Sequence, residues 1–324
     1  MGQNEEQKCM RIIVVGLGVQ GHKRRQFAGT DYVLSVDPVN VNADYHSIQD
    51  VPLKNFDAAL LCVPDEPKIE LIHYLLSNGK HVLVEKPLWA AEDKSIESLQ
   101  SLARAKNLIL YTAYNHRFEP HFIRMHDLLA SHALGEIYRC RMFYGNGTAR
   151  LVRDSDWRDQ GAGVLPDLGS HLLDIVHFWF GIQSEFFSIV SSHCFENRSP
   201  DHVVFHNQDT NPKLEMEMTL LSWRNHFTCD IFAEKGSAHI SSLCKWGPSQ
   251  FTYRMRELPS GIPKEDVVTL AQPDPTWALE YAHFKSLCVN GVKTDLSVDI
   301  WLNSVLRKLS EEMIGEKKLC INLQ

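Results

Sequence analysis

The first third of the chain alternates short apolar runs with segments that fit helices. The apolar runs predict buried strands at residues 11–15, 32–36, 58–63, 81–85 and 108–113. The segments between them predict helices at residues 22–28, 68–77 and 91–105. Short, continuously apolar strands separated by helices predict a parallel sheet that is covered on both faces.

The rest of the chain follows a different pattern. Residues 213–220 alternate apolar and polar side chains, as a sheet with one buried and one exposed face requires. Further strands are predicted at residues 137–144, 186–190 and 227–233, with a turn at 234–237. A proline-rich loop is expected at residues 259–275, and helices are predicted at 276–288 and 298–313.

Composition narrows the class of protein. The 324 residues are 44% apolar, which suffices for two moderate cores. The net charge of −7 offers no basic surface for a phosphate backbone, so we expect no nucleic-acid partner. No run approaches the roughly 20 apolar residues that span a bilayer, and the first residues lack the form of a secretion signal. We therefore expect no membrane partner and a cytoplasmic location.

Cysteines and histidines do not form recognisable patterns. The eight cysteines are scattered without a Cys-x-x-Cys pair, and we interpret them as reduced thiols. Histidines cluster loosely at His116, His121, His126 and His132, but they join no cysteine or carboxylate at a ligand spacing. We therefore predict no metal site.

A glycine-rich turn follows the first predicted strand and precedes the first predicted helix. In such a turn the first glycine permits the tight bend, the second lets a pyrophosphate approach the backbone, and the third lets helix and strand pack closely. A plain glycine-rich turn is the alternative. The flanking elements favour a dinucleotide site formed by Gly16, Gly18, Val19, Gln20 and Gly21.

Asp37 ends the second predicted strand and bears on the choice of dinucleotide. A carboxylate at this place accepts hydrogen bonds from ribose hydroxyls and repels a 2′-phosphate. Pro38-Val39-Asn40 supplies no arginine to receive that phosphate. We therefore expect NAD as the cofactor rather than NADP.

Three side chains can provide acid–base chemistry, and we predict that they are catalytic: Lys86, Asp167 and His171. A histidine with a pKa of about 6.5 can take a hydroxyl proton near neutral pH while a hydride leaves the same carbon. Asp167 lies four residues earlier, so both would project from one face of a helix. Lys86 would stabilise the developing alkoxide. The alternatives are a surface lysine, a helix cap and a packed core histidine.

Four segments together resemble the glucose-fructose oxidoreductase, inositol dehydrogenase and MocA-like (Gfo/Idh/MocA) family. They are residues 16–21, 79–88, 115–118 and 161–174, and their order and approximate spacing match. The resemblance implies an NAD-binding Rossmann domain at residues 1–118. It also implies a substrate-binding and oligomerisation α+β domain at residues 119–324, built on a large open, mainly antiparallel sheet. Whether the C-terminal helices pack back on the first domain is left open.

The same resemblance implies further contacts. Arg117 is expected at the substrate or in an interdomain ion pair. One loop departs from the family pattern, because Asp65 and Lys68 stand where an asparagine and a later histidine are common. Cofactor contacts are implied for Val63, Pro64, Glu85, Lys86 and Asn115.

Residues 147–159 precede the predicted catalytic helix and carry three arginines and a tryptophan. Arginine forks suit phosphate or carboxylate groups, and tryptophan stacks on sugar or base rings. An anionic or nucleotide-linked sugar is therefore one hypothesis, and a solvated loop with internal salt bridges is the other. The predicted substrate contacts are Lys86, Arg117, Arg153, Trp157, Arg158, Asp167 and His171.

These observations predict an NAD-dependent oxidoreductase that moves a hydride between the nicotinamide and a secondary alcohol or ketone carbon of a sugar or cyclic polyol. Two alternatives stay open. One is a glycosidase that oxidises its sugar transiently with NAD, and the other is a non-catalytic, NAD-binding regulator of the same fold. Because an open sheet face commonly becomes a subunit interface, we expect a homodimer or homotetramer through the C-terminal domain.

Overall fold

The computed structural model describes residues 10–155, 158–207 and 210–321. The chain separates into two compact units. Unit 1 extends to Tyr114 and includes Trp277–Ile300, and unit 2 comprises Asn115–Thr276 and the chain from Trp301 onward. Residues 277–300, which the sequence analysis assigns to the second domain, therefore fall in unit 1.

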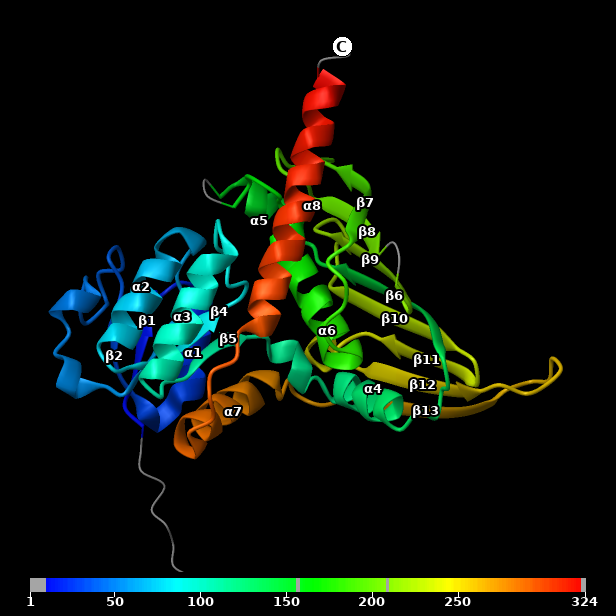
Figure 1. The fold of residues 1–324 in the computed structure, drawn as a ribbon, viewed down its shortest axis with the longest axis horizontal. Helices are drawn as coiled ribbons and strands as arrows, with labels where there is room; N and C mark the ends of the chain where they lie inside the picture. Colours follow the sequence, from blue (N-terminus) through cyan, green and yellow to red (C-terminus); the bar gives the residue numbers. More distant parts are fainter. Residues whose placement is uncertain (1–9, 156–157, 208–209, 322–324) are drawn as a thin grey trace, which may run out of the picture. The chain divides into compact units, whose positions relative to one another are not determined.

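Unit 1 is a parallel sheet with helices on both faces (Figure 1). The five strands lie in the order β2-β1-β3-β4-β5. Their bounds are β1 Ile12–Val15, β2 Tyr32–Val36, β3 Ala58–Leu61, β4 His81–Glu85 and β5 Leu110–Ala113. The helices are α1 Val19–Ala28, α2 Asp65–Ser77, α3 Asp93–Ala105 and α7 Thr276–Asn290.

Alternate residues of these strands face two separate cores. Helices α2 and α3 pack on the face that includes Ile13 and Val15. Ala28 of α1 and Phe284 of α7 belong to the core on the other face, which includes Val14. Since both faces are covered, the strands are apolar at nearly every position, which confirms the predicted parallel sheet.

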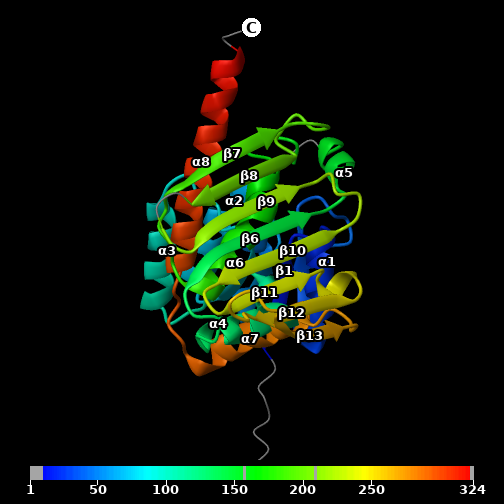
Figure 2. The ribbon, with the colours of Figure 1, turned by 90° about the vertical axis from the view of Figure 1, so that its right-hand side faces the viewer.

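Unit 2 is built on an eight-stranded sheet with the order β13-β12-β11-β10-β6-β9-β8-β7, which Figure 2 shows face-on. All neighbouring strands are antiparallel except β6 and β9. The bounds are β6 Ile137–Gly145, β7 Phe187–His193, β8 His202–Asn207, β9 Lys213–Thr219, β10 His226–Ala233, β11 Gly236–Ser241, β12 Ser249–Met255 and β13 Lys264–Leu270. This confirms the predicted open, mainly antiparallel sheet.

Helices of unit 2 lie behind the sheet in the view of Figure 2. Their bounds are α4 Pro120–Ala130, α5 Ala149–Arg153, α6 Ser170–Phe180 and α8 Ser297–Ile321. Helix α6 is joined to α4, because Trp179 Nε1 donates a hydrogen bond of 3.0 Å to the Phe122 carbonyl. Glu185 binds α8 by accepting from Ser304 and Lys308. None of the described helices is both long and apolar enough to cross a membrane.

The sequence prediction is wrong for residues 259–275, where a loop is expected and β13 forms. This strand has no buried residue and pairs only with β12, at the edge of the sheet. Its side chains, beginning Lys264-Glu265-Asp266, give no apolar signal. Backbone pairing and the 2.6 Å ion pair between Arg254 and Glu265 hold it instead.

Candidate active site

The carboxyl ends of four parallel strands place the predicted cofactor residues of unit 1. Gly16 follows β1, Asp37 follows β2, Val63 and Pro64 follow β3, and Lys86 follows β4. Since the carboxyl ends of parallel strands meet at one edge, these residues form a row along it. The structure therefore brings this set together within unit 1.

The glycine turn has the geometry that a dinucleotide site needs. Gly16 has φ of +91°, and a Cβ there would lie 2.3 Å from the Cys62 carbonyl oxygen. A Cβ on Gly21 would lie 1.8 Å from the Gly16 carbonyl oxygen, so helix α1 can approach the turn only with glycine there. A Cβ on Gly18, the N-cap of α1, would meet nothing within 4 Å. The turn thus leaves open space at the start of a helix, where a pyrophosphate binds.

Asp37 is held by the backbone on both of its carboxylate oxygens. The N–H groups of Leu17, Val39 and Asn40 donate to it at 2.7, 2.9 and 2.8 Å. Burial alone would raise the pKa of Asp37, but these N–H groups lower it below its ordinary value. A carboxylate oxygen has more than one lone pair, so the anion can still accept from ribose hydroxyls.

Glu85, the last residue of β4, is bound by a buried arginine that sequence analysis missed. Arg24 of α1 donates to Glu85 at 2.6 Å and to Glu280 of α7 at 2.6 Å, and its side chain is 2% exposed. Its guanidinium also lies 4.4 Å from the centre of the Trp277 ring. A charged residue in a helix usually indicates a solvated surface, so no pattern in the sequence indicates this contact.

In unit 2, the backbone around Asp167 and His171 is less regular than expected. Asp167 lies in a turn of π-helix, Leu165–Gly169, and His171 lies in the first turn of α6. The prediction of one uninterrupted α-helix is therefore corrected. The N-cap positions of the π turn and of α6 are Val164 and Gly169, so Asp167 stands at neither of these two N-caps.

His171 is surrounded by aromatic side chains that sequence analysis did not identify as site residues. Its ring stacks on His116, with centroids 4.0 Å apart and planes at 20°, and the Tyr144 ring lies 6.1 Å away. Both histidines are buried. Lys245 Nζ lies 3.0 Å from His116 Nε2, which must be the acceptor because an ammonium only donates. Burial, and then the charge of Asp167, raise the pKa of Tyr144.

Asn115 and Arg117 are engaged within unit 2. Asn115 donates from its amide to the Thr276 hydroxyl at 2.8 Å. Arg117 Nε lies 3.0 Å from both carboxylate oxygens of Asp174, and its Nη2 also contacts Asp174. Burial raises the pKa of Asp174, and Arg117 opposes that shift in part. Since Asp174 is in the same unit, this ion pair does not join the two units.

The arginines of residues 147–159 have acidic neighbours. Distances between the paired charged atoms are 3.8 Å for Arg150 and Glu196, 3.3 Å for Arg153 and Asp154, and 3.6 Å for Arg158 and Asp167. Trp157, also predicted at the substrate, lies outside the described residues. Only the Arg153–Asp154 pair is internal to the loop, because Glu196 and Asp167 lie outside residues 147–159.

Two family models match the chain. One, described as an oxidoreductase family with an NAD-binding Rossmann fold, matches residues 14–114. The other, described as the GFO/IDH/MocA C-terminal domain, matches residues 122–239. The chain belongs to the Gfo/Idh/MocA family of oxidoreductases. The family resemblance deduced from the four motifs is thereby confirmed, and the turn at Gly16 is that of an NAD-binding fold.

Other Gfo/Idh/MocA proteins share modest identity with this chain. The uncharacterised oxidoreductase YdgJ of Escherichia coli (strain K12) is 30% identical over 190 residues, covering 52% of this chain and 54% of that protein. The trans-1,2-dihydrobenzene-1,2-diol dehydrogenase of Oryctolagus cuniculus is 26% identical over 241 residues, covering 74% and 72%. For three uncharacterised relatives, the chain spans 34%, 54% and 58% of their own lengths.

A solved structure of similar fold is that of the UDP-N-acetylglucosamine 3-dehydrogenase GnnA from Acidithiobacillus ferrooxidans. The TM-score is 0.77, and the likeness covers 94% of this chain and 97% of that chain. Sequence identity is 17%, so the likeness concerns the fold alone. The likeness of fold therefore extends over nearly the whole length of both chains.

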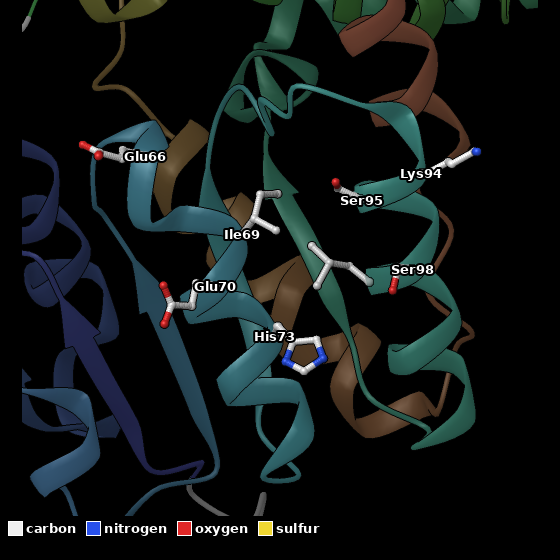
Figure 3. A pocket seen from close by; sticks show the side chains of 8 residues that line it. Glu66, Ile69, Glu70, His73, Lys94, Ser95 and Ser98 are labelled. Atoms are coloured by element: carbon white, nitrogen blue, oxygen red, sulfur yellow. The ribbon is translucent and has the colours of Figure 1, made fainter.

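A groove of about 590 Å³ lies between α2 and α3 in unit 1 (Figure 3). Of the predicted site residues that the structure describes, none lines it. The groove is lined from α2 by Glu66, Ile69, Glu70 and His73, and from α3 by Lys94, Ser95, Ser98 and Leu99.

No group of three or more His, Cys, Asp or Glu residues in the described ranges could hold a metal ion.

Substitution with alanine should have opposite effects at Gly18 and Gly21, the glycines at the start of α1 and within it. The first substitution should affect NADH binding, and the second should affect stability. Gly18→Ala should leave the free energy of unfolding within about 0.5 kcal/mol, because its Cβ meets open space. It should weaken NADH binding by about tenfold or more, because the methyl group occupies the pyrophosphate space. Gly21→Ala should destabilise unit 1 by about 1–3 kcal/mol through overlap with the Gly16 carbonyl.

Fluorescence titration with NADH and urea unfolding measure the two effects. If Gly18→Ala binds NADH as tightly as the original chain, the open space at Gly18 is not the pyrophosphate site.

Proposed function

We propose that this Gfo/Idh/MocA protein is an NAD-dependent dehydrogenase that acts on a secondary alcohol or ketone carbon of a sugar or cyclic polyol. The observation that carries the proposal is that one chain holds both an NAD-type turn with Asp37 in unit 1 and, in unit 2, a buried His171 four residues after the partly exposed Asp167. The names of two similar proteins support it, since one is a dehydrogenase of a cyclic diol and the other of a nucleotide-linked sugar.

The proposed roles follow from the chemistry of alcohol oxidation. Bound NAD supplies the hydride acceptor. His171 takes the hydroxyl proton, and its stacking on His116 fixes the plane of the imidazole. Lys86 donates to the reacting oxygen and stabilises its developing negative charge. Asp167, with a side chain 39% exposed, is the carboxylate available to bind a neighbouring substrate hydroxyl.

The proposed substrate is an uncharged sugar or cyclic polyol. Arg153 and Arg158 already have carboxylate neighbours at 3.3 and 3.6 Å, so an anionic group would have to compete with them. A nucleotide-linked sugar is the second candidate, supported by the name of the structurally similar dehydrogenase. A panel that contains both kinds of sugar separates the two.

The outer face of the unit 2 sheet is the proposed contact between copies of the chain. It carries a row of cross-strand ion pairs, including Arg139 with Glu215 at 2.8 Å and Arg141 with Glu215 at 3.0 Å. Phe232 is paired with Arg139 across the strands and is 48% exposed. A face of eight strands with exposed aromatic side chains and alternating charges suits a symmetric pairing of two copies.

Replacing the proposed proton acceptor, His171, or the proposed donor to the reacting oxygen, Lys86, should slow turnover strongly. We expect Lys86→Met and His171→Asn each to lower kcat by about 100- to 10,000-fold, measured at 340 nm on the sugar that the original chain oxidises best. His171→Asn should bind NADH normally. Lys80→Met and His126→Asn replace a lysine and a histidine elsewhere, and their kcat should match that of the original chain.

A kcat within about tenfold of the original chain in either variant would contradict the role assigned to that residue. NADH binding without turnover on any sugar would instead favour the regulator, and NAD-dependent hydrolysis of a glycoside would favour the glycosidase.

Asp37 should set the preference for NAD. Asp37→Asn removes the negative charge that repels a 2′-phosphate, so the ratio of kcat/KM for NAD to kcat/KM for NADP should fall by about tenfold or more. Asp44→Asn is the matched control, because Asp44 also accepts from the backbone, at Ser35, but does not follow a strand end. An unchanged ratio in Asp37→Asn would show that another residue chooses the cofactor.

The proposed contact between copies predicts the mass in solution. Sedimentation should give two or four times the chain mass of 37.0 kDa. Phe232→Glu, which places a charge in the contact, should shift the mass toward 37.0 kDa, whereas Val39→Glu on unit 1 should not. A mass of 37.0 kDa for the original chain at micromolar concentration would contradict the proposal.

A further inference from the structure

The turn that carries Lys86 is held by a second lysine. Lys68 of α2 has a side chain that is 2% exposed. Its Nζ donates to the carbonyl oxygen of Glu85 at 3.1 Å and to that of Pro87 at 2.8 Å. These carbonyls belong to the residues immediately before and after Lys86, so one ammonium bridges the backbone on both sides of it.

The third hydrogen of this ammonium is also used. Lys68 Nζ lies 2.6 Å from Asp65 Oδ1, three residues earlier on α2, and the Asp65 side chain is 47% exposed. An ammonium has three donors, and all three therefore have acceptors. Burying a charge costs several kcal/mol unless it is paired and hydrogen-bonded, and the three acceptors together offset that cost for Lys68.

The strand end is also held through a side chain. Arg24 of α1 binds the carboxylate of Glu85, while Lys68 of α2 binds the carbonyl of the same residue. Two cations, each with a side chain 2% exposed, thus hold β4 at its last residue, one from each helix layer. Lys86, which follows directly and is partly exposed, extends from a backbone that is fixed on both sides.

We propose that Lys68, with Asp65 as its counter-ion, is a positioning residue for Lys86; the inference rests on the proposed role of Lys86 in the reaction. Lys68 itself is buried with its three donors engaged, so it acts through the backbone rather than on the substrate. A catalytic donor displaced by about 1 Å can lose about 100-fold in rate. This chain departs from the family pattern at Asp65 and Lys68. The proposed role of these two residues is to hold the backbone on both sides of Lys86.

The chain provides a matched control for this contact. Lys80 Nζ also bridges two backbone carbonyls, those of Leu53 at 2.6 Å and Phe56 at 2.7 Å. Lys80 precedes β4, whereas Lys86 follows it. Lys80→Met therefore removes the same kind of interaction at the opposite end of the same strand.

Hydrogen exchange on the protein without substrate tests the backbone contact directly. In Lys68→Met, amides of residues 82–90 should exchange about tenfold faster or more, because the turn loses its cross-link. In Lys80→Met, exchange in that segment should match that of the original chain. This measurement does not depend on activity, so it tests the contact even if the dehydrogenase proposal fails.

A double-mutant cycle tests the link to Lys86. Lys68→Met should lower kcat by about 10- to 100-fold and change the KM of the substrate by less than about threefold. In a Lys86→Met background the same substitution should have no further effect on kcat, because the residue that Lys68 positions is absent. A purely structural defect would lower kcat equally in both backgrounds.

Asp65→Ala provides a second variant in case Lys68→Met does not fold. It removes an exposed carboxylate, so the protein should fold. Its kcat should be lower than that of the original chain, but by a smaller factor than in Lys68→Met. Two results in Lys68→Met would overturn the inference: unchanged exchange at residues 82–90, or the same loss of kcat with and without Lys86. If only Asp65→Ala folds, a kcat equal to that of the original chain would overturn it. Lys68→Met and Lys86→Met could both keep full activity while amide exchange is faster in Lys68→Met. That result would contradict the proposed role of Lys86 in the reaction, but it would still establish the backbone contact of Lys68.

Discussion

Unit 1 depends on one constraint, which is that a parallel sheet covered on both faces leaves little room for polar groups along its strands, where Ser35 and Thr112 are the buried polar exceptions among the described residues. Ile13 and Val14 face different cores and are both fully buried. Polar chemistry must therefore lie where the strands end. The row from Asp37 to Lys86 follows from this, because each of its residues lies just after the carboxyl end of a strand.

Buried charges then fix the geometry of that edge. Arg24 and Lys68 have almost no exposed surface, and an isolated charge in such a place would be strongly destabilising. Each is tolerated because carboxylates and carbonyls surround it. These acceptors come from different elements, since Arg24 joins α1 to β4 and α7. Pairing the charges thus ties helices to the strand end that carries Lys86, so the energetic requirement and the positioning of the site coincide.

The sequence predicted what is encoded locally and missed what depends on tertiary contacts. The apolar runs gave β2 and β4 with their observed bounds, and the glycine spacing gave the turn at Gly16. Arg24 was missed because its partner Glu280 lies 256 residues away. His116 stood within a recognised motif, but its contact with His171 arises only when two distant segments pack together. No periodicity in a single sequence records such pairings.

Two carboxylates near the start of α6 show how the fold assigns different tasks to the same chemical group. Asp174 is 1% exposed and is bound by both sides of the Arg117 guanidinium fork, so it serves to anchor that arginine within unit 2. Asp167 is 39% exposed, and Arg158 approaches it only to 3.6 Å. A substrate hydroxyl can displace a loose, solvated ion pair but cannot reach a buried one. The difference in burial, rather than the position along the helix, is therefore what favours Asp167 over Asp174 in the proposed role of binding substrate.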